Sequence, residues 1–265
     1  MPLELAKANR DARPFVVTLA GFADRDYSGF DQTECSIGQI GGISKALKAA
    51  ECDAVCFAGY VQRPDLKTLK LDARGLTMVP RALAAGRKGD DALIRVVVDE
   101  FESQGFRVVG ADEVFSSLAP QLDSRFSEVD AAPHANDIAK ACEIARAIGK
   151  LDIGQGCVVA DGLVLAVEAQ EGTNAMLERL LTLRQELRGS SDARLGVLAK
   201  MPKPIQERRV DLPTIGPDTV ERCAAAGLAG IALEAGSALV LDRSAVEAAL
   251  SRHGMFLQIV EPIDE

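Results

Sequence analysis

Residues 200–242 read KMPKPIQERRVDLPTIGPDTVERCAAAGLAGIALEAGSALVLD. Three prolines between positions 202 and 213 exclude a helix from the first part, because proline lacks an N–H donor and clashes with the preceding turn. Gly216-Pro217 then predicts a helix start, and Gly227 its end. The apolar run 228–233 predicts a buried strand after this helix. A polar loop, a helix and a strand in this order are typical of an α/β protein.

The loop at the start of this stretch is dense in polar side chains. It leads to a helix N-terminus, where free N–H groups and the helix dipole favour anionic ligands. An ordinary solvated loop has a similar composition, so the residues alone leave both interpretations open. The polar residues are Lys200, Lys203, Gln206, Glu207, Arg208, Arg209 and Asp211.

The composition indicates one large or two smaller globular domains and argues against nucleic acid as a partner. The chain has 265 residues, of which 48% are hydrophobic, so it can bury a sizeable core. Its net charge is −9, aromatic residues make up only 4%, and tryptophan is absent. Nucleic acid is therefore not expected to bind, since both a basic face and a stacking platform are missing.

The cysteines and histidines do not predict a metal centre. The chain has six cysteines, and Cys56 of the C-x3-C pair Cys52/Cys56 lies in an apolar run, which favours a buried thiol over a zinc ligand. Two histidines, His134 and His253, are too few for a histidine-based cluster. The N-terminus lacks the apolar segment of a signal peptide, and no apolar run approaches the ~20 residues of a transmembrane helix. We expect a cytoplasmic protein with reduced thiols.

The first half alternates strands and helices. A strand at 15–20, a helix at 37–50 and a strand at 53–58 form the unit of a parallel sheet, with 21–34 as a polar loop. We therefore predict a Rossmann-like parallel sheet for the first domain. Further helices are expected at 2–9, 72–83 and 86–104, and a strand at 106–109.

Two places in this half are candidates for ligand binding. Arg63 follows the strand at 53–58, and ligands of open α/β sheets bind beyond the carboxyl ends of strands. An ordinary surface arginine is the alternative. Asp90 and Asp91 can hold a metal at the start of the helix 86–104, but acids in a first turn also complement the helix dipole.

The second half differs from the first. Prolines and acidic residues predict a linker at 119–134 between a domain at 1–118 and one at 135–265, which carries the candidate catalytic loop. Asp161-Gly162 between two apolar runs is a strong hairpin signal. The second domain should therefore contain a mixed sheet with helices.

Two carboxylates follow this hairpin. Glu168 and Glu171 precede a predicted helix that Thr173 or Asn174 can cap and that runs to residue 187. Carboxylates after a strand and before a helix can bind sugar hydroxyls or a cation. Simple capping chemistry explains them as well.

The polar residues at strand ends suit phosphate chemistry. The motifs G-x-S-x-G, G-x-x-x-x-G-K-[ST] and G-x-G-x-x-G are absent from the sequence. Lysine and arginine neutralise phosphate oxygens, and a carboxylate such as Asp211 can hold Mg²⁺ together with substrate phosphates. The residues support a phosphate-containing ligand and leave open whether it is hydrolysed.

Several segments closely resemble the LpxI-type UDP-2,3-diacylglucosamine pyrophosphatases. Each segment has its own motif, and their order along nearly the whole chain is that of the family. They are FAG (57–59) with RP (63–64), KGDDAL (88–93), DIGQG (152–156) with VLAVEAQEGT (164–173), and KPIQERRVDLPTIG (203–216).

This resemblance implies a lipid A biosynthesis enzyme of a Gram-negative bacterium. Such an enzyme cleaves UDP-2,3-diacylglucosamine into UMP and 2,3-diacylglucosamine 1-phosphate, called lipid X. Family members look like two α/β domains with the lipid product between them, require Mg²⁺ or another divalent cation, and allow a homodimer. A lipid substrate also implies peripheral contact with the cytoplasmic face of the inner membrane, although no stretch reads as a clearly basic amphipathic helix.

The resemblance also implies roles for individual residues. The family's key acid falls on Asp211, the expected catalytic residue, which would hold the metal or the attacking water. The other expected substrate-binding residues are Lys200, Lys203, Gln206 and Arg209 at the phosphates, Glu171 and Thr173 in the second domain, and Arg63 in the first.

The chain departs from the family in two places. Family members open with a strand and a glycine-rich loop of the type L-I-A-G-G-G-x-L-P, whereas Met1-Pro2-Leu3-Glu4-Leu5 matches only the helix that follows. We expect the first sheet to lack its first strand and the natural start to lie upstream. Asn174 stands where the family usually has Asp, which weakens any metal role there.

Two other functions remain as alternatives. A non-catalytic nucleotide-sugar or acyl-sugar binding protein would have the same fold, and the incomplete start favours it. Release of UMP from the UDP-sugar separates this alternative from the enzyme. An NAD-dependent enzyme would also have an α/β first half, but the missing glycine fingerprint argues against it.

Overall fold

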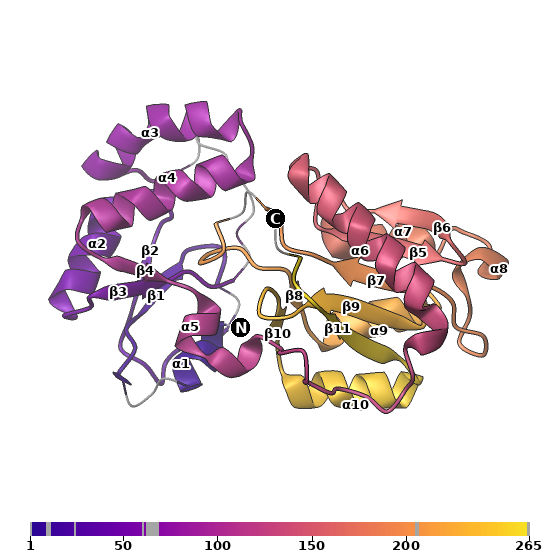
Figure 1. Cartoon of the computed structure of the whole chain (residues 1–265). Coiled ribbons are helices and arrows are strands. Elements are labelled where there is room, and N and C mark those ends of the chain that lie inside the picture. The colour runs from indigo at the N-terminus through magenta and orange to yellow at the C-terminus, as the bar shows by residue number, and fades with distance from the viewer. Residues whose placement is uncertain are drawn as a thin grey trace. The chain divides into compact units, whose positions relative to one another are not determined.

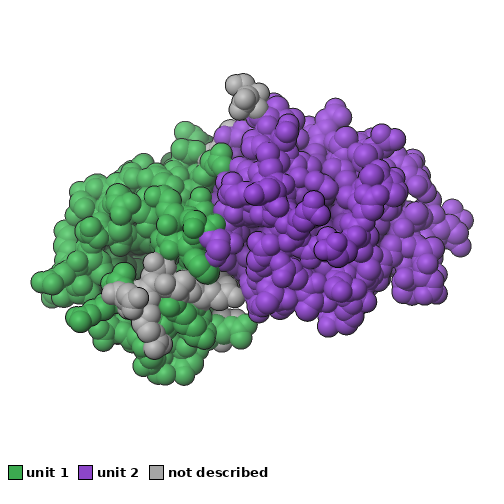
Figure 2. Space-filling model, turned by 60° about the horizontal axis from the view of Figure 1, so that its bottom comes forward, with its two compact units in different colours: residues 1–116, 207–210 green, residues 117–206, 211–265 purple. Residues whose placement is uncertain are grey.

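A computed structural model of the chain describes residues 2–8, 12–23, 25–59, 61, 69–204 and 207–263. The chain divides into two compact units, coloured separately in Figure 2. Unit 1 comprises residues 1–116 and 207–210, and unit 2 comprises residues 117–206 and 211–265. The charged loop therefore leaves unit 2 after residue 206, contributes four residues to unit 1, and returns at Asp211.

Unit 1 contains two pairs of parallel strands among its described residues (Figure 1). Strand β1 (Val16–Leu19) pairs with β2 (Gln32–Cys35), and β3 (Ala54–Cys56) pairs with β4 (Arg107–Val109). The predicted parallel α/β arrangement is confirmed. The helices are α1 (Pro2–Ala8), α2 (Ile40–Ala49), α3 (Ala73–Gly86), α4 (Asp90–Ser103) and α5 (Ala111–Val114), and a 3-10 turn η2 (Ser116–Leu118) follows.

Strand β2 corrects the prediction of a polar loop over the whole of 21–34. Its sequence, QTEC, has no apolar run, and its residues alternate between exposed and half-buried positions. Parallel pairing with β1 supplies the backbone hydrogen bonds, so the strand forms without a continuous apolar face. The core of unit 1 lies beside it, between α2, α4 and β4, around Phe101 and Phe106.

Unit 2 is built on a mixed five-stranded sheet with the order β11-β9-β7-β5-β6. Strand β5 runs antiparallel to both neighbours, and β7, β9 and β11 are parallel to one another. The predicted Asp161-Gly162 hairpin joins β5 and β6, with positive φ at both residues. The strands are β5 (Gly156–Ala160), β6 (Leu163–Val167), β7 (Val197–Lys200), β9 (Gly230–Glu234) and β11 (Phe256–Val260), and β8 (Thr214–Ile215) pairs separately with β10 (Leu239–Val240).

Helices cover both faces of this sheet (Figure 1). Successive residues of β7 alternate between two cores, Leu198 on one side and Val197 with Ala199 on the other. The first core includes residues of α7, α9 and α10, and the second includes residues of α6. These helices are α6 (Ala135–Lys150), α7 (Gly172–Leu180), α9 (Pro217–Ala225) and α10 (Arg243–His253), with η3 (Ala132–His134) before α6 and the short α8 (Gln185–Arg188) after α7.

One helix of unit 2 is shorter than predicted. The sequence predicts a single helix to residue 187, but α7 ends at Leu180 and α8 forms only later. Arg188 donates to the carbonyls of Leu183 and Ala226 at 3.1 and 3.0 Å. Hydrogen bonds of this side chain therefore hold the connecting turn against the end of α9, in place of a continuous helix.

Candidate active site

Three residues lie in a row across β6, β5 and β7 at one edge of the sheet. Glu168, directly after β6, donates its N–H to the carbonyl of Gly156 at 2.8 Å. Gly156 begins β5 and pairs in register with Lys200, the last residue of β7. Residues opposite each other in an antiparallel ladder project from the same face. The side chains of Glu168 and Lys200 therefore share one face, with a glycine between them.

The glycines at this edge leave the space that Glu168 occupies. A Cβ on Gly156 would lie 2.4 Å from Oε2 of Glu168, and a Cβ on Gly154 would lie 2.0 Å from its carbonyl oxygen. Both distances are far shorter than van der Waals contact. Glu168 is therefore packed directly against the backbone of 154–156, and a side chain at Gly154 or Gly156 would displace it.

Lys200 is a buried cation at this edge, with only 5% of its surface exposed. Its ammonium donates to the carbonyl of Thr214 at 3.1 Å. Burial lowers the pKa of Lys200, and the nearby carboxylates of Glu168 and Asp211 oppose this shift. A buried ammonium with one protein acceptor retains donors for an anionic ligand.

Two buried acceptors at the same edge have no partner among the described residues. They are Oε2 of Glu168 and Oε1 of Gln155, which precedes β5. Buried polar atoms normally have a hydrogen-bond partner, so each of these oxygens can accept from a water or a ligand. The sequence marked Glu168 as a carboxylate after a strand, whereas Gln155 entered only through the DIGQG segment.

Helices α7 and α9 both begin near this edge. No side chain caps the N-terminus of α7, whereas at α9 the hydroxyl of Thr219 accepts from the N–H of Gly216 at 3.4 Å. The prediction that Thr173 or Asn174 caps α7 is wrong, because both lie within its first turn and Glu171 takes the N-cap position. A turn between β6 and α7, in which the N–H of Gly172 donates to the carbonyl of Ala169 at 3.1 Å, starts the helix at Gly172. An uncapped helix N-terminus next to a buried ammonium can bind an anion.

The predicted residues of unit 2 differ in their surroundings. Asp211 is half-buried and is the first residue after the chain returns to this unit. Glu171 forms an ion pair with Arg179 at 3.2 Å. Lys203 lies 2.9 Å from Oδ1 of Asp152, in the DIGQG segment. Thr173 is half-buried in the first turn of α7.

Arg209 lies in unit 1, bound by carboxylates. Its guanidinium donates to both oxygens of Glu207, at 2.8 and 3.0 Å, and to Glu102 at 2.6 Å. These hydrogen bonds to Glu207 and Glu102 raise the pKa of Arg209 above its usual value. The carboxylate of Asp91 accepts from the N–H of Glu207 at 2.7 Å and pairs with Arg95 at 2.7 Å. Predicted contacts Arg63 and Gln206 lie outside the described residues.

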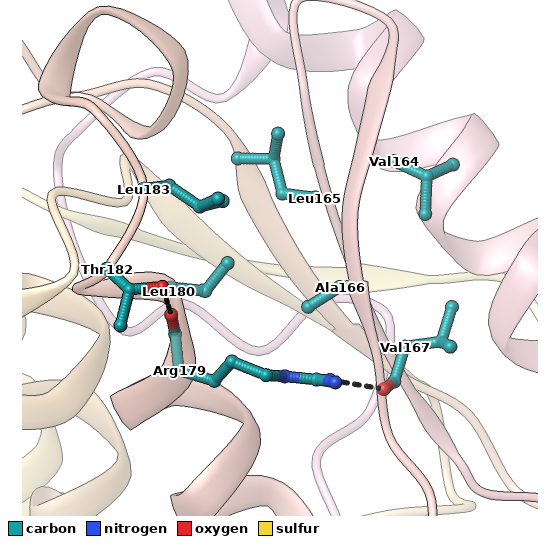
Figure 3. A pocket seen from close by; sticks show the side chains of 8 residues that line it. All are labelled: Val164, Leu165, Ala166, Val167, Arg179, Leu180, Thr182 and Leu183. Atoms are coloured by element: carbon teal, nitrogen blue, oxygen red, sulfur yellow. Dashed lines mark hydrogen bonds between the residues drawn. The ribbon is translucent and has the colours of Figure 1, made fainter.

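An apolar pocket of about 520 Å³ opens between β6 and the C-terminal end of α7. Leu165, Leu180 and Leu183 line it, and Arg179 donates to the carbonyl of Val167 at 3.1 Å (Figure 3). The side chains predicted from sequence to bind substrate are not among its lining residues. The pocket approaches the polar edge through Val167, the residue before Glu168, and through Arg179, which pairs with Glu171.

Comparison with known proteins identifies the family. The model of the LpxI N-terminal domain matches residues 1–118, and that of the LpxI C-terminal domain matches residues 126–258. The chain belongs to the LpxI family. One LpxI relative, from Caulobacter vibrioides, is named UDP-2,3-diacylglucosamine pyrophosphatase LpxI. It is 54% identical over 265 residues, which cover 99% of this chain and 94% of the relative. The resemblance seen in the sequence is confirmed.

The described part of this LpxI-family chain shows neither a ready metal cluster nor a helix that could span a membrane. It holds no group of three or more histidine, cysteine, aspartate or glutamate side chains that could bind a metal ion. Cys56 lies partly buried in β3, and burial raises its pKa to about 11, as expected for a structural thiol. Among the described residues, every helix is too short or too polar to cross a membrane.

Proposed function

We propose that this LpxI-family chain hydrolyses the pyrophosphate bond of UDP-2,3-diacylglucosamine. Water adds to one phosphorus, the bridging P–O bond breaks, and UMP and 2,3-diacylglucosamine 1-phosphate are released with a proton. The observation that carries this proposal is the 54% identity, over 99% of the chain, to a relative named for this pyrophosphatase. The polar edge of unit 2 supports it, because a buried ammonium and the uncapped N-terminus of α7 suit phosphate oxygens.

The residues of this edge have different proposed roles, which follow from their chemistry. Lys200 neutralises phosphate oxygens from a buried position, where its charge acts more strongly than in water. Asp211 orients the attacking water or holds a divalent cation. The free oxygen of Glu168 accepts a hydrogen bond from a sugar hydroxyl. Arg63, Glu171, Thr173, Lys203, Gln206 and Arg209 complete the proposed substrate contacts.

A divalent cation such as Mg²⁺ is part of this proposal. Mg²⁺ needs only one or two protein carboxylates when substrate phosphates and water supply its other ligands. Asp211 and Glu168 are carboxylates of that type, and both act on the charge of Lys200. The described residues hold no ready cluster of three side chains that could bind a metal ion. When bound, the cation would neutralise the phosphate charge that develops during hydrolysis.

The proposed reaction belongs to lipid A biosynthesis in a Gram-negative bacterium. We place it in the cytoplasm, with peripheral contact to the inner membrane, because the substrate carries two acyl chains while its uridine nucleotide is polar. A homodimer is part of the same proposal and rests on the family alone.

The decisive experiment measures UMP release from UDP-2,3-diacylglucosamine in the presence of Mg²⁺. We expect Asp211→Asn to lower kcat roughly 10²- to 10⁴-fold, because the carboxylate would be lost from the reacting groups. Asp192→Asn is the matched control, since Asp192 is an exposed acid in the turn between α8 and β7, before the end of β7 opposite to Lys200. Full turnover by the Asp211 variant would contradict the role of Asp211. Binding of the UDP-sugar by the wild type without UMP release would favour the non-catalytic alternative.

A further inference from the structure

Helix α3 exposes both of its leucines to solvent and buries Met78 together with two small residues. Leu76 is 62% exposed and Leu83 is 49% exposed, whereas Gly75 and Ala85 are buried. The two leucines are seven residues apart, so they lie on the same side of the helix. In an ordinary surface helix leucines face the core, so a side of α3 that exposes both leucines is unusual.

The inward side of α3 is fixed tightly to its neighbour α2. Asp72 accepts from the N–H of Gly75 at 2.7 Å and from that of Gly42 at 2.8 Å. A Cβ on Gly75 would lie 2.0 Å from the carbonyl oxygen of Gly38. Rotation of the helix to bury its leucines would break these contacts. The exposure of Leu76 and Leu83 is therefore built into the packing of unit 1.

Basic residues accompany the exposed leucines. The segment 73–88 carries four basic residues, Arg74, Arg81, Arg87 and Lys88, and no acidic one, in a chain whose net charge is −9. Within the part of the chain that the structure describes, Arg87 and Lys88 form no ion pair, and Arg81 reaches Asp99 and Glu100 only at 3.8 and 3.9 Å. Basic residues after a helix complement its dipole, and Arg74 pairs with Glu100, but neither fact explains the exposed leucines.

A shallow groove of about 390 Å³ continues this surface between α3 and α4, which lie side by side in Figure 1. Its floor is made of small apolar side chains, among them Ala84, Ala92 and Val96. Arg81, Lys88 and Arg95 also line it, together with one acid, Asp99. Apolar side chains at the centre of a basic surface are the pattern of proteins that lie on anionic membranes.

We infer that the α3 surface, defined by Leu76, Leu83, Arg81, Arg87 and Lys88, docks on a bilayer containing anionic lipids. The leucines would enter the boundary between headgroups and acyl chains, and the basic side chains would contact lipid phosphates. Charge complementarity selects this partner, since the surface is locally positive on a negative chain. The inference rests on the peripheral membrane contact of the proposed function and names the residues that make it. It depends on the packing of unit 1 and not on the pyrophosphatase reaction.

The test is co-sedimentation of the full chain with vesicles of phosphatidylcholine containing 30 mol% phosphatidylglycerol, a composition chosen at roughly physiological anionic charge. We expect binding to these vesicles at low salt, loss of binding at high salt, and little binding to phosphatidylcholine alone. Arg87→Gln with Lys88→Gln should lower the partition coefficient roughly 30-fold, because each basic residue near an anionic surface contributes about 1 kcal/mol. Leu76→Ser with Leu83→Ser should lower it roughly tenfold or more.

Two double variants on unit 2 are matched controls. Lys140→Gln with Arg184→Gln removes the same charge, and Leu163→Ser with Leu181→Ser removes two leucines that are 54% and 47% exposed. Both controls should bind like the wild type, and circular dichroism should show all variants folded. Equal losses in the controls, or no binding of the wild type to anionic vesicles, would overturn the inference. Unchanged binding of both α3 variants would also overturn it.

Discussion

Lys200 and Arg209 are nine residues apart in one charged stretch of sequence, yet the surroundings of their side chains differ. Arg209 is held in unit 1 by the carboxylates of Glu207 and Glu102. Lys200 is buried in unit 2 and, within the described part of the chain, donates to a single backbone carbonyl. A cation neutralised by two carboxylates anchors its segment, whereas a buried cation with spare donors is prepared for a ligand. Charge density in a sequence therefore does not distinguish an anchor from a binding residue.

The largest effect that tests this contrast is on catalysis. We expect Lys200→Met to lower kcat/KM for the UDP-sugar roughly 10²- to 10³-fold, the loss typical of a preorganised group that stabilises developing charge. Lys203→Met is the comparison variant, because Lys203 is already paired with Asp152 and should lose less. Steady-state UMP release measures both. A similar loss in the two variants would place Lys203 at the phosphates as well.

A glycine substitution tests the packing of the Lys200 edge. Gly156→Ala should lower the free energy of unfolding by about 1–3 kcal/mol, because the new Cβ would lie 2.4 Å from Glu168 Oε2. Gly42→Ala is the control, since its Cβ would meet nothing closer than 3.7 Å in α2. There we expect stabilisation by about 0.5–1 kcal/mol. Urea unfolding measures both, and equal stability of wild type and Gly156→Ala would contradict the close packing of Glu168.

The anchoring role of Arg209 predicts a smaller effect on stability. Arg209→Met should lower the free energy of unfolding by about 1 kcal/mol, because the pairs are partly exposed but include a bidentate contact. Arg209→Lys should recover only part of it, since lysine cannot make the two parallel bonds to Glu207. Unfolding in low and high salt separates the ionic share. If both variants lost activity but no stability, substrate binding would be the main role of Arg209.

The smallest expected effect is the contribution of Lys200 to the pH dependence of the free energy of unfolding. Its pKa is lowered in the folded state by burial, so the unfolded state binds more protons between that pKa and the ordinary value of about 10.4. The free energy of unfolding should therefore rise with pH in this window through Lys200. The difference between wild type and Lys200→Met isolates this contribution from other titrating groups. A difference that fell with increasing pH would mean that Lys200 gains a proton on folding.

Prediction from sequence was most successful where one local rule sufficed. The Asp161-Gly162 hairpin and the start of α9 at Pro217 follow from backbone preferences of a few residues. The polar strand β2 was missed because its partner β1 supplies the stabilising hydrogen bonds. The cap of α7 was misplaced because a backbone turn between Ala169 and Gly172 starts that helix at Gly172. In the first case a partner strand, and in the second a backbone turn, outweighed the local propensity of the side chains.

By itself, the sequence determined the alternation of strands and helices, the polar character of the loop at 200–211, and the motifs that assign the chain to the LpxI family. Only the tertiary structure decided that Glu168 and Lys200 share a face across Gly156, that Arg209 is held by two carboxylates, and that α3 turns its leucines outward. Periodicity records which residues lie on one side of an element. Whether that side meets a core, a partner charge or solvent depends on elements distant in the chain.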